Sequence, residues 1–274
     1  MTTARPLGSV ISLWRYPVKS VMGEELNTSE VTTGGLLGDR GFALVDASNG
    51  KVVSAKNPRK WTKLFEMRAT FVESPRIGAK LPAVRIMLPD GTLVSSEQAN
   101  VNQILSQGIG REVVLQSVAP QAPTLEEYWP DIQELDRRDV VTDEAMPSKT
   151  FFDCSSVHVL TTATIDQLRK AYAQGRFEVR RFRPNIVVAP ASGESGFVEN
   201  AWVGHTVAIG EQVRLRVTGP CPRCVMTTLP QGDLPQDAGI LRTAAQQNQA
   251  HVGVYASVIQ AGTIQRGDSV LFAD

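Results

Sequence analysis

The chain has 274 residues, of which 42% are hydrophobic and 20% are charged, so it suits two modest folded domains. Its 28 Lys and Arg residues balance its 28 Asp and Glu residues, which argues against a surface built for nucleic acid. The sequence has no long apolar run, no secretory signal and only three cysteines, and it therefore predicts a cytoplasmic protein without a membrane partner.

The amino-terminal third has the pattern of short β-strands separated by turns. Turn residues such as Asn49-Gly50 lie between runs rich in β-branched and aromatic residues. The runs that we expect to be strands are 10–16, 41–46, 51–54, 84–88 and 92–94. Val101, Ile104 and Leu105 fall on one face of a short helix that we predict over residues 97–107.

Residues 120–149 break this pattern, because four prolines punctuate an acidic stretch. We interpret the segment as a long connection between two domains. Connections of this length are unusual unless they have a function, so a lid beside a site is an alternative role.

The carboxy-terminal part returns to strand patterns, with one clear helix. An apolar strand at 157–160 precedes a helix predicted over 165–173, where Thr164 and Gln167 have the spacing of a capping box. The other runs that we expect to be strands are 185–189, 207–209, 213–217, 253–259 and 269–272. Taken together, the predicted strands and helices indicate a mainly β fold with a few helices, in two domains.

Cys221-Pro222-Arg223-Cys224 is the strongest local motif, and its residues alone leave four interpretations open. A structural zinc site needs two further ligands, and the remaining cysteine and histidines have no second paired spacing. A dithiol redox pair would sit at a helix start, which the residues after Cys224 do not favour. A thiolate favoured by Arg223 would suit a soft transition metal. Two small buried apolar side chains are the plain structural alternative.

Two other clusters have side chains that suit an anionic ligand. Arg180, Arg181 and Arg183 place three guanidinium groups before a strand that begins with Asn185. In the first domain, turns rich in glycine lie near Lys19-Ser20 and Arg40, where the backbone can approach a phosphate. Three unrelated surface charges are the alternative for the arginines. His158 lies in an apolar run, and we expect a satisfied core residue there.

Several motifs recur in an order that resembles one family. With these motifs the chain is similar to the two-domain MOSC proteins, the group that contains the amidoxime-reducing components and bacterial relatives. MOSC is named for the carboxy-terminal domain of molybdenum cofactor sulfurase. The motifs are 14–20, Leu37-Gly38-Asp39-Arg40, 160–164, Arg181-Phe182-Arg183-Pro184-Asn185, Cys221-Pro222-Arg223-Cys224 and 262–268. The resemblance covers nearly the whole chain.

The resemblance implies a fold and a set of site residues. It implies an amino-terminal β-barrel-like domain at 1–118, a linker or lid at 119–149 and a MOSC domain at 150–274, with a cofactor cleft between two barrel-like domains. It makes Cys224 the catalytic residue and the molybdenum ligand. The residues that it implies for binding the molybdopterin are Lys19, Ser20, Arg40, Thr161, Thr162, Arg183, Asn185 and, less directly, Tyr255.

The resemblance also implies an activity. We expect a molybdenum-cofactor-dependent oxidoreductase that reduces small N-hydroxylated compounds such as hydroxylamines and amidoximes. Three cysteines are too few for a fused iron–sulfur domain, so electrons would come from a separate flavoprotein, ferredoxin or cytochrome. The alternative is a carrier of molybdenum cofactor or of sulfur, with a Cys224 persulfide or thiolate.

Overall fold

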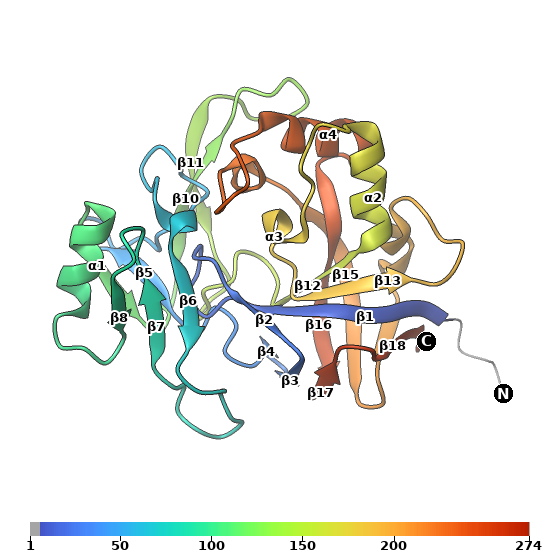
Figure 1. Cartoon of the computed structure of the whole chain (residues 1–274), viewed down its shortest axis with the longest axis horizontal. Helices are drawn as coiled ribbons and strands as arrows, with labels where there is room; N and C mark the ends of the chain where they lie inside the picture. The colour runs from blue at the N-terminus through green and yellow to red at the C-terminus, as the bar shows by residue number, and fades with distance from the viewer. Residues whose placement is uncertain (1–5, 274) are drawn as a thin grey trace.

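A computed structural model describes residues 6–273, and the fold is mainly β with a few helices, as the sequence predicts. Seven strands close into a barrel (Figure 1). The barrel closes because β1 pairs with both β13 and β18. Around the barrel the strands are β1 (Pro6–Arg15), β13 (Ile186–Pro190), β12 (Val157–Thr161), β16 (His251–Gln260), β15 (Val213–Pro222), β14 (Thr206–Ile209) and β18 (Ser269–Phe272).

The barrel is held by one apolar core that strands from both ends of the chain share. Leu13 of β1, Val159 of β12 and Val217 of β15 are all buried in this core. β12 and β13 run parallel, and the helices between them make the crossover that a parallel pair requires. Because β1 closes a barrel of carboxy-terminal strands, the first strand of the chain packs with the last 120 or so residues, roughly one domain's length. The division at 118 and 150 remains a prediction.

A second lobe is formed by the rest of the amino-terminal half (Figure 1). Its core includes Leu44, Trp61, Phe65, Ile86 and Leu105. The hairpin expected at 84–94 lies here, whereas residues 51–54 form only an isolated bridge, Val45 with Val52, and the strand at 43–46 pairs with residues 113–116 instead. Its elements are β5 (Ala43–Asp46), η1 (Leu64–Glu66), β6 (Arg68–Phe71), β7 (Val84–Met87), β8 (Leu93–Ser95), α1 (Val101–Ile109) and β9 (Val113–Gln116). Helix α1 ends at Ile109, two residues beyond the predicted end at 107. It stops there because Gly110 adopts the left-handed conformation and caps it.

Two further small sheets join the lobe to the barrel. β3 (Thr28–Thr32) pairs with β4 (Gly35–Leu36) and with β17 (Gly262–Gln265). β2 (Glu24–Leu26) pairs antiparallel with the end of β1. The segment interpreted as a connection contains an antiparallel hairpin, β10 (Thr124–Trp129) with β11 (Val140–Ala145). Leu125 is buried in a small core, and ion pairs from Lys51 and Lys60 to Glu126 fasten β10 to the lobe.

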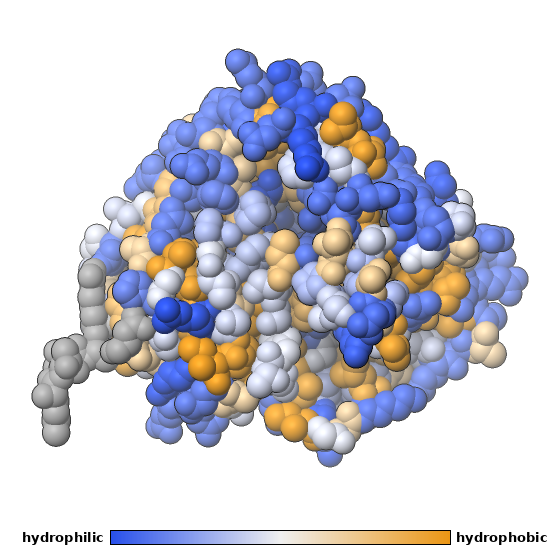
Figure 2. Space-filling view, turned by 180° about the vertical axis from the view of Figure 1, so that it is seen from behind, coloured by the Kyte–Doolittle hydropathy of each residue, from blue (hydrophilic) through white to orange (hydrophobic). Residues whose placement is uncertain are grey.

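The helices cover one end of the barrel (Figure 1). α2 begins three residues before the predicted start, because Thr161 rather than Thr164 caps it. The helical elements of this half are α2 (Thr162–Ala171), α3 (Val179–Phe182), η2 (Val198–Trp202), η3 (Val225–Thr228) and α4 (Ala238–Asn248). Among the described residues, no helix combines the length and apolar character needed to cross a membrane. Hydrophobic residues on the opposite face form only scattered patches among hydrophilic ones (Figure 2).

Candidate functional site

A cavity of about 260 Å³ lies where the barrel, the lobe and the β10–β11 hairpin meet. Six Lys or Arg residues and three Asp or Glu residues line it, although the whole chain is electrically balanced. The charged lining residues are Lys19, Arg40, Lys56, Arg181, Arg183, Arg223, Glu127, Glu144 and Asp153. A concave site with an excess of cations favours an anionic ligand.

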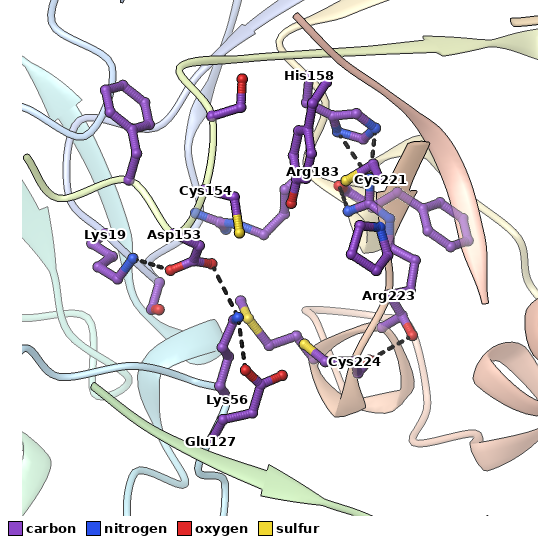
Figure 3. A pocket seen from close by; sticks show the side chains of 18 of the residues that line it. Lys19, Lys56, Glu127, Asp153, Cys154, His158, Arg183, Cys221, Arg223 and Cys224 are labelled. Atoms are coloured by element: carbon purple, nitrogen blue, oxygen red, sulfur yellow. Dashed lines mark hydrogen bonds and ion pairs between the residues drawn. The ribbon is translucent and has the colours of Figure 1, made fainter. Parts of the chain in front are cut away.

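Cys224 lies two residues beyond the end of β15 and faces this cavity (Figure 3). Cys221 is the second-last residue of β15, and Cys224 follows as the N-cap residue of η3. Two register shifts between β15 and β16 precede the motif and turn the chain toward the cavity. Burial raises the pKa of Cys224 to about 12, and Glu127 adds to the effect. The side chain is therefore a thiol until a metal cation displaces its proton.

Arg223 does not serve Cys224. Its guanidinium donates to the sulfur of Cys221 and to the backbone oxygens of Phe182 and Val252, at 2.9 and 2.7 Å. The prediction that Arg223 favours a reactive thiolate is therefore corrected: the cation beside Cys224 is Lys56, which lowers the pKa of Cys224 against the effect of burial. Cys221 is buried and belongs to the structural support of the loop.

His158 is the satisfied, buried histidine that the sequence predicts, and it also lines the cavity. Its Nε2 atom lies 2.6 Å from a guanidinium nitrogen of Arg223 and 3.1 Å from the oxygen of Val252. Burial, then Arg223, lowers the pKa of His158 well below its usual range, so the ring is neutral. A glycine is required opposite it, because a Cβ atom on Gly253 would lie 2.3 Å from Nε2.

Three of the predicted cofactor-binding residues share an uncommon backbone conformation. Ser20, Arg40 and Arg183 have φ angles of 60°, 49° and 52°, in the left-handed region, and all three line the cavity. Residues other than glycine adopt this region at an energetic cost and do so most often at functional sites. The surrounding fold therefore holds the backbone at these three residues in the left-handed conformation, and their side chains line the cavity.

Arg183 provides the test of whether an anionic cofactor suits this cavity. One guanidinium nitrogen donates to the oxygen of Val21 at 2.9 Å, and the group lies 4.1 Å from the centre of the Tyr16 ring. The other terminal nitrogen is buried and has no hydrogen-bond partner among the described residues. Burial lowers the pKa of Arg183 to about 10, so the group is charged at neutral pH. A buried, charged and unpaired donor suits a phosphate or another acceptor-rich group.

The other two arginines of the cluster have different roles. Arg181 is almost fully buried, and its donors all go to backbone oxygens, those of Arg176, Thr227, Leu229 and Pro235. It fastens the loop that follows Cys224. Arg180 is directed to the surface, where it pairs with Glu178 and Asp233. Of the three guanidinium groups predicted to meet an anion, Arg183 alone has a buried donor without a partner among the described residues.

Lys19 and Arg40 reach the cavity with carboxylate partners. Lys19 pairs with Asp153 and donates to the oxygen of Phe151 at 2.8 Å, and Arg40 pairs with Asp39. Asn185 is fixed by the barrel instead. Its amide donates to Asp39 at 2.8 Å, and its oxygen accepts from the backbone N–H of His158. Tyr255 also lines the cavity.

Thr161 and Thr162 are the predicted site residues that do not line the cavity. The Thr161 hydroxyl donates to Glu199 at 2.6 Å and accepts from the backbone N–H of Thr164, so it caps helix α2. Glu199 is fully buried, and burial raises its pKa. The carboxylate occupies the helix start where the sequence suggested a phosphate.

Sequence reasoning missed the charged residues on the side of the cavity opposite the barrel. Lys56 donates to Glu127 at 2.9 Å and forms an ion pair with Asp153 at 3.7 Å (Figure 3). We call Lys19, Lys56, Glu127 and Asp153 the lobe wall, and Arg181, Arg183, Arg223 and Cys224 the barrel wall. Apart from Lys19, the residues of the lobe wall belong to no local motif, because they come from distant segments. Only a hairpin prediction at 124–145 would have indicated Glu127.

The zinc and dithiol interpretations of the cysteine motif receive no support. No group of three or more His, Cys, Asp or Glu side chains within residues 6–273 has the geometry to hold a metal ion. All three cysteines are free, and they differ in exposure, with Cys154 exposed, Cys221 buried and Cys224 between them. A metal at Cys224 would take its other ligands from a cofactor.

Comparison with known proteins gives a consistent result over most of the chain. Residues 147–271 match the family described as "MOSC domain", and residues 7–91 match the "MOSC N-terminal beta barrel domain". A relative in Rattus norvegicus, "Mitochondrial amidoxime reducing component 2", is 25% identical over 96% of this chain and 83% of its own length. The protein of that name in Bos taurus is 27% identical over the same shares.

A second group of relatives matches a smaller part of a longer protein. "Molybdenum cofactor sulfurase" of Oryza sativa subsp. japonica is 26% identical over 79% of this chain and 28% of its own length.

Proposed function

The chain belongs to the MOSC domain family, and from this premise we propose that it is a molybdenum-cofactor-dependent oxidoreductase that reduces N-hydroxylated compounds. The observation that carries the proposal is that Cys224 and Arg183, which has a buried donor without a partner, line the same cationic cavity. A thiolate binds a soft metal, and the guanidinium binds an anionic group attached to it.

Each proposed residue has a role that its position supports. Cys224 would be the ligand to molybdenum, while Arg183, Arg40 and Lys19 would bind the anionic side of the molybdopterin. Asn185 and Ser20 would position it through their fixed polar atoms. When bound, the cofactor supplies a two-electron redox centre, and the protein orients it and shields it from water.

The reaction that we propose is R–NHOH + 2H⁺ + 2e⁻ → R–NH₂ + H₂O. The N–O bond breaks, the nitrogen keeps the electron pair and gains a proton, and the oxygen leaves as water. The two electrons would come from a separate donor protein of the flavoprotein, ferredoxin or cytochrome class. The cytoplasm is the proposed location. The proposed reduction has its support in relatives that are named amidoxime reducing components.

A carrier of molybdenum cofactor or of sulfur is the second candidate, and the likeness to the sulfurase of Oryza sativa favours it. A carrier would use the same cavity and the same cysteine. It would bind the cofactor and release it to another protein without turning over an N-hydroxylated compound.

The test uses protein made in a host that synthesises molybdenum cofactor, with benzamidoxime as substrate and reduced methyl viologen as electron donor. We expect steady formation of benzamidine by the wild-type protein and none by Cys224→Ser. Cofactor-loaded protein that forms no benzamidine, but transfers cofactor to an apoenzyme, would overturn the oxidoreductase proposal in favour of the carrier.

A further inference from the structure

Lys56 and Glu127 present a donor and an acceptor side by side on the lobe wall. The Lys56 ammonium group donates to Glu127 Oε2 at 2.9 Å, and their side chains are only 15% and 7% exposed. The ammonium group carries three N–H donors, and this hydrogen bond uses one of them. The Asp153 oxygen at 3.7 Å is an ion-pair partner beyond hydrogen-bond distance.

The surrounding fold holds this pair in place. The backbone oxygen of Lys56 accepts from the N–H of Tyr128 at 2.8 Å, which joins the 54–57 loop to β10 next to Glu127. On the other side, the backbone N–H of Ala55 donates to the Ser20 hydroxyl at 3.1 Å. The backbone that carries the pair is therefore held by hydrogen bonds to two other segments of the fold.

The pair faces the sulfur of Cys224 across the cavity (Figure 3). Lys56, Glu127 and Cys224 all line the same cavity. A substrate head group in this cavity can therefore contact the Lys56–Glu127 pair. The barrel wall, in contrast, offers its free donor through Arg183 for the cofactor.

We propose that Lys56 and Glu127 together bind the N–O head group of the substrate and orient its oxygen toward the metal position at Cys224. An N-hydroxylated base has an oxygen beside an N–H group, and the pair offers an N–H donor beside a carboxylate acceptor. The ammonium group donates to the substrate oxygen, and the carboxylate accepts from the substrate N–H. The inference rests on the proposed function and assigns the two residues that determine which head groups bind.

The experiment measures binding of benzamidoxime to the cofactor-loaded protein without an electron donor, so that no turnover occurs. We expect Lys56→Met and Glu127→Gln each to raise the dissociation constant by about tenfold, as for the loss of one charge-assisted hydrogen bond. The double variant should be little weaker than either single variant, because the two residues bind one head group. Molybdenum and pterin content should stay at the wild-type level.

Lys60→Met is the matched control. Lys60 lies four residues from Lys56 and is similarly buried, but it pairs with Asp46 and Glu126 and does not line the cavity. Its variant should bind benzamidoxime within about twofold of wild type, because a charge that is paired elsewhere and does not contact the ligand contributes little to binding. Unchanged binding in Lys56→Met, with wild-type protein that binds, would overturn the inference alone.

A second readout does not depend on the cofactor or on the substrate. In cofactor-free protein, the alkylation of Cys224 by iodoacetate and by iodoacetamide is compared by mass spectrometry of the Cys224 peptide. A cation facing the sulfur favours the anionic reagent, so Lys56→Met should lower the ratio of the two rates and Lys60→Met should not. An unchanged ratio in Lys56→Met would overturn the inference. Wild-type protein that neither binds nor reduces benzamidoxime would instead overturn the proposed function.

Discussion

The two walls of the cavity hold their charges in different ways. On the lobe wall, Lys19 and Lys56 are paired with the carboxylates of Asp153 and Glu127. On the barrel wall, Arg181 and Arg223 donate mainly to backbone oxygens, and within residues 6–273 neither forms an ion pair. Glu199, buried behind the barrel, likewise accepts from hydroxyl groups and not from a cation.

This difference shows how one cavity can serve an anionic cofactor and an uncharged substrate. The lobe wall is close to neutral, because its cations and carboxylates neutralise one another. The barrel wall keeps positive charge that the protein itself does not neutralise, and Arg183 keeps a donor as well. An anion bound against the barrel wall would gain both, while the lobe wall offers hydrogen bonds to a neutral head group.

The largest expected effect on stability belongs to Arg181→Met. The substitution leaves the backbone oxygens of Thr227, Leu229 and Pro235 without a donor in a buried position. We expect a loss of about 3 kcal/mol in the free energy of unfolding, measured by urea denaturation. A loss below about 1 kcal/mol would mean that backbone oxygens do not anchor the barrel wall.

Arg183→Met should act on cofactor binding more than on folding. Its unpaired donor contributes no hydrogen bond within the protein, so cofactor-free Arg183→Met should lose less stability than Arg181→Met. Cofactor-loaded Arg183→Met should release its pterin about thirtyfold more readily, which corresponds to about 2 kcal/mol. Pterin fluorescence in the filtrate after dialysis measures the release. Pterin retention equal to that of the wild type would show that Arg183 does not bind the cofactor.

Glu199, which accepts from Thr161 of the barrel, and Asp153 of the lobe wall should contribute to stability with opposite pH dependence. Burial raises the pKa of Glu199, so folding favours its protonated form, and its contribution to stability is lost as pH rises through the folded-state pKa. Lys19 and Lys56 lower the pKa of Asp153 against burial, so its contribution is present above the usual value and is lost as pH falls.

The check is urea denaturation of Glu199→Gln and Asp153→Asn between pH 3 and pH 8, roughly the range of carboxyl titration. Glu199→Gln should gain stability relative to wild type as pH rises, and Asp153→Asn should lose it. Two variants that change in the same direction would contradict the comparison of the walls.

The smallest effect is expected for Arg180→Met, one residue before Arg181. Its ion pairs with Glu178 and Asp233 lie near the surface, where Asp233 is 63% exposed. Exposed ion pairs contribute about 0.5 kcal/mol, so urea denaturation should detect little change. A loss as large as that of Arg181→Met would show that neither burial nor backbone acceptors distinguish the two arginines.

Local sequence patterns predicted the elements whose hydrophobic residues repeat regularly. The strand at 157–160 and the hairpin at 84–94 lie where the pattern placed them, because buried apolar residues within each segment decide its structure. The hairpin at 124–145 was predicted as a connection. Its strand at 124–129 carries Glu127, a buried carboxylate that accepts a hydrogen bond from Lys56 of another segment. No local sequence pattern indicates that contact.

The candidate site was predictable where short motifs carry it. Cys224, Arg183 and Arg40 come from short motifs and all line the cavity, and Arg40 and Arg183 also adopt the left-handed backbone conformation. Thr161 was assigned to the cofactor through the family resemblance, but its hydroxyl already donates to Glu199. Lys56 was missed because its importance follows from the tertiary arrangement alone.

The measurement that tests the central claim most directly is the molybdenum and pterin content of purified wild-type protein, Cys224→Ser and Cys221→Ser, made in a host that synthesises the cofactor. The account predicts near-stoichiometric molybdenum and pterin in the wild type, loss of molybdenum in Cys224→Ser, and retention of both in Cys221→Ser. Wild-type protein with neither molybdenum nor pterin, or equal loss in both variants, would contradict a molybdenum site at Cys224.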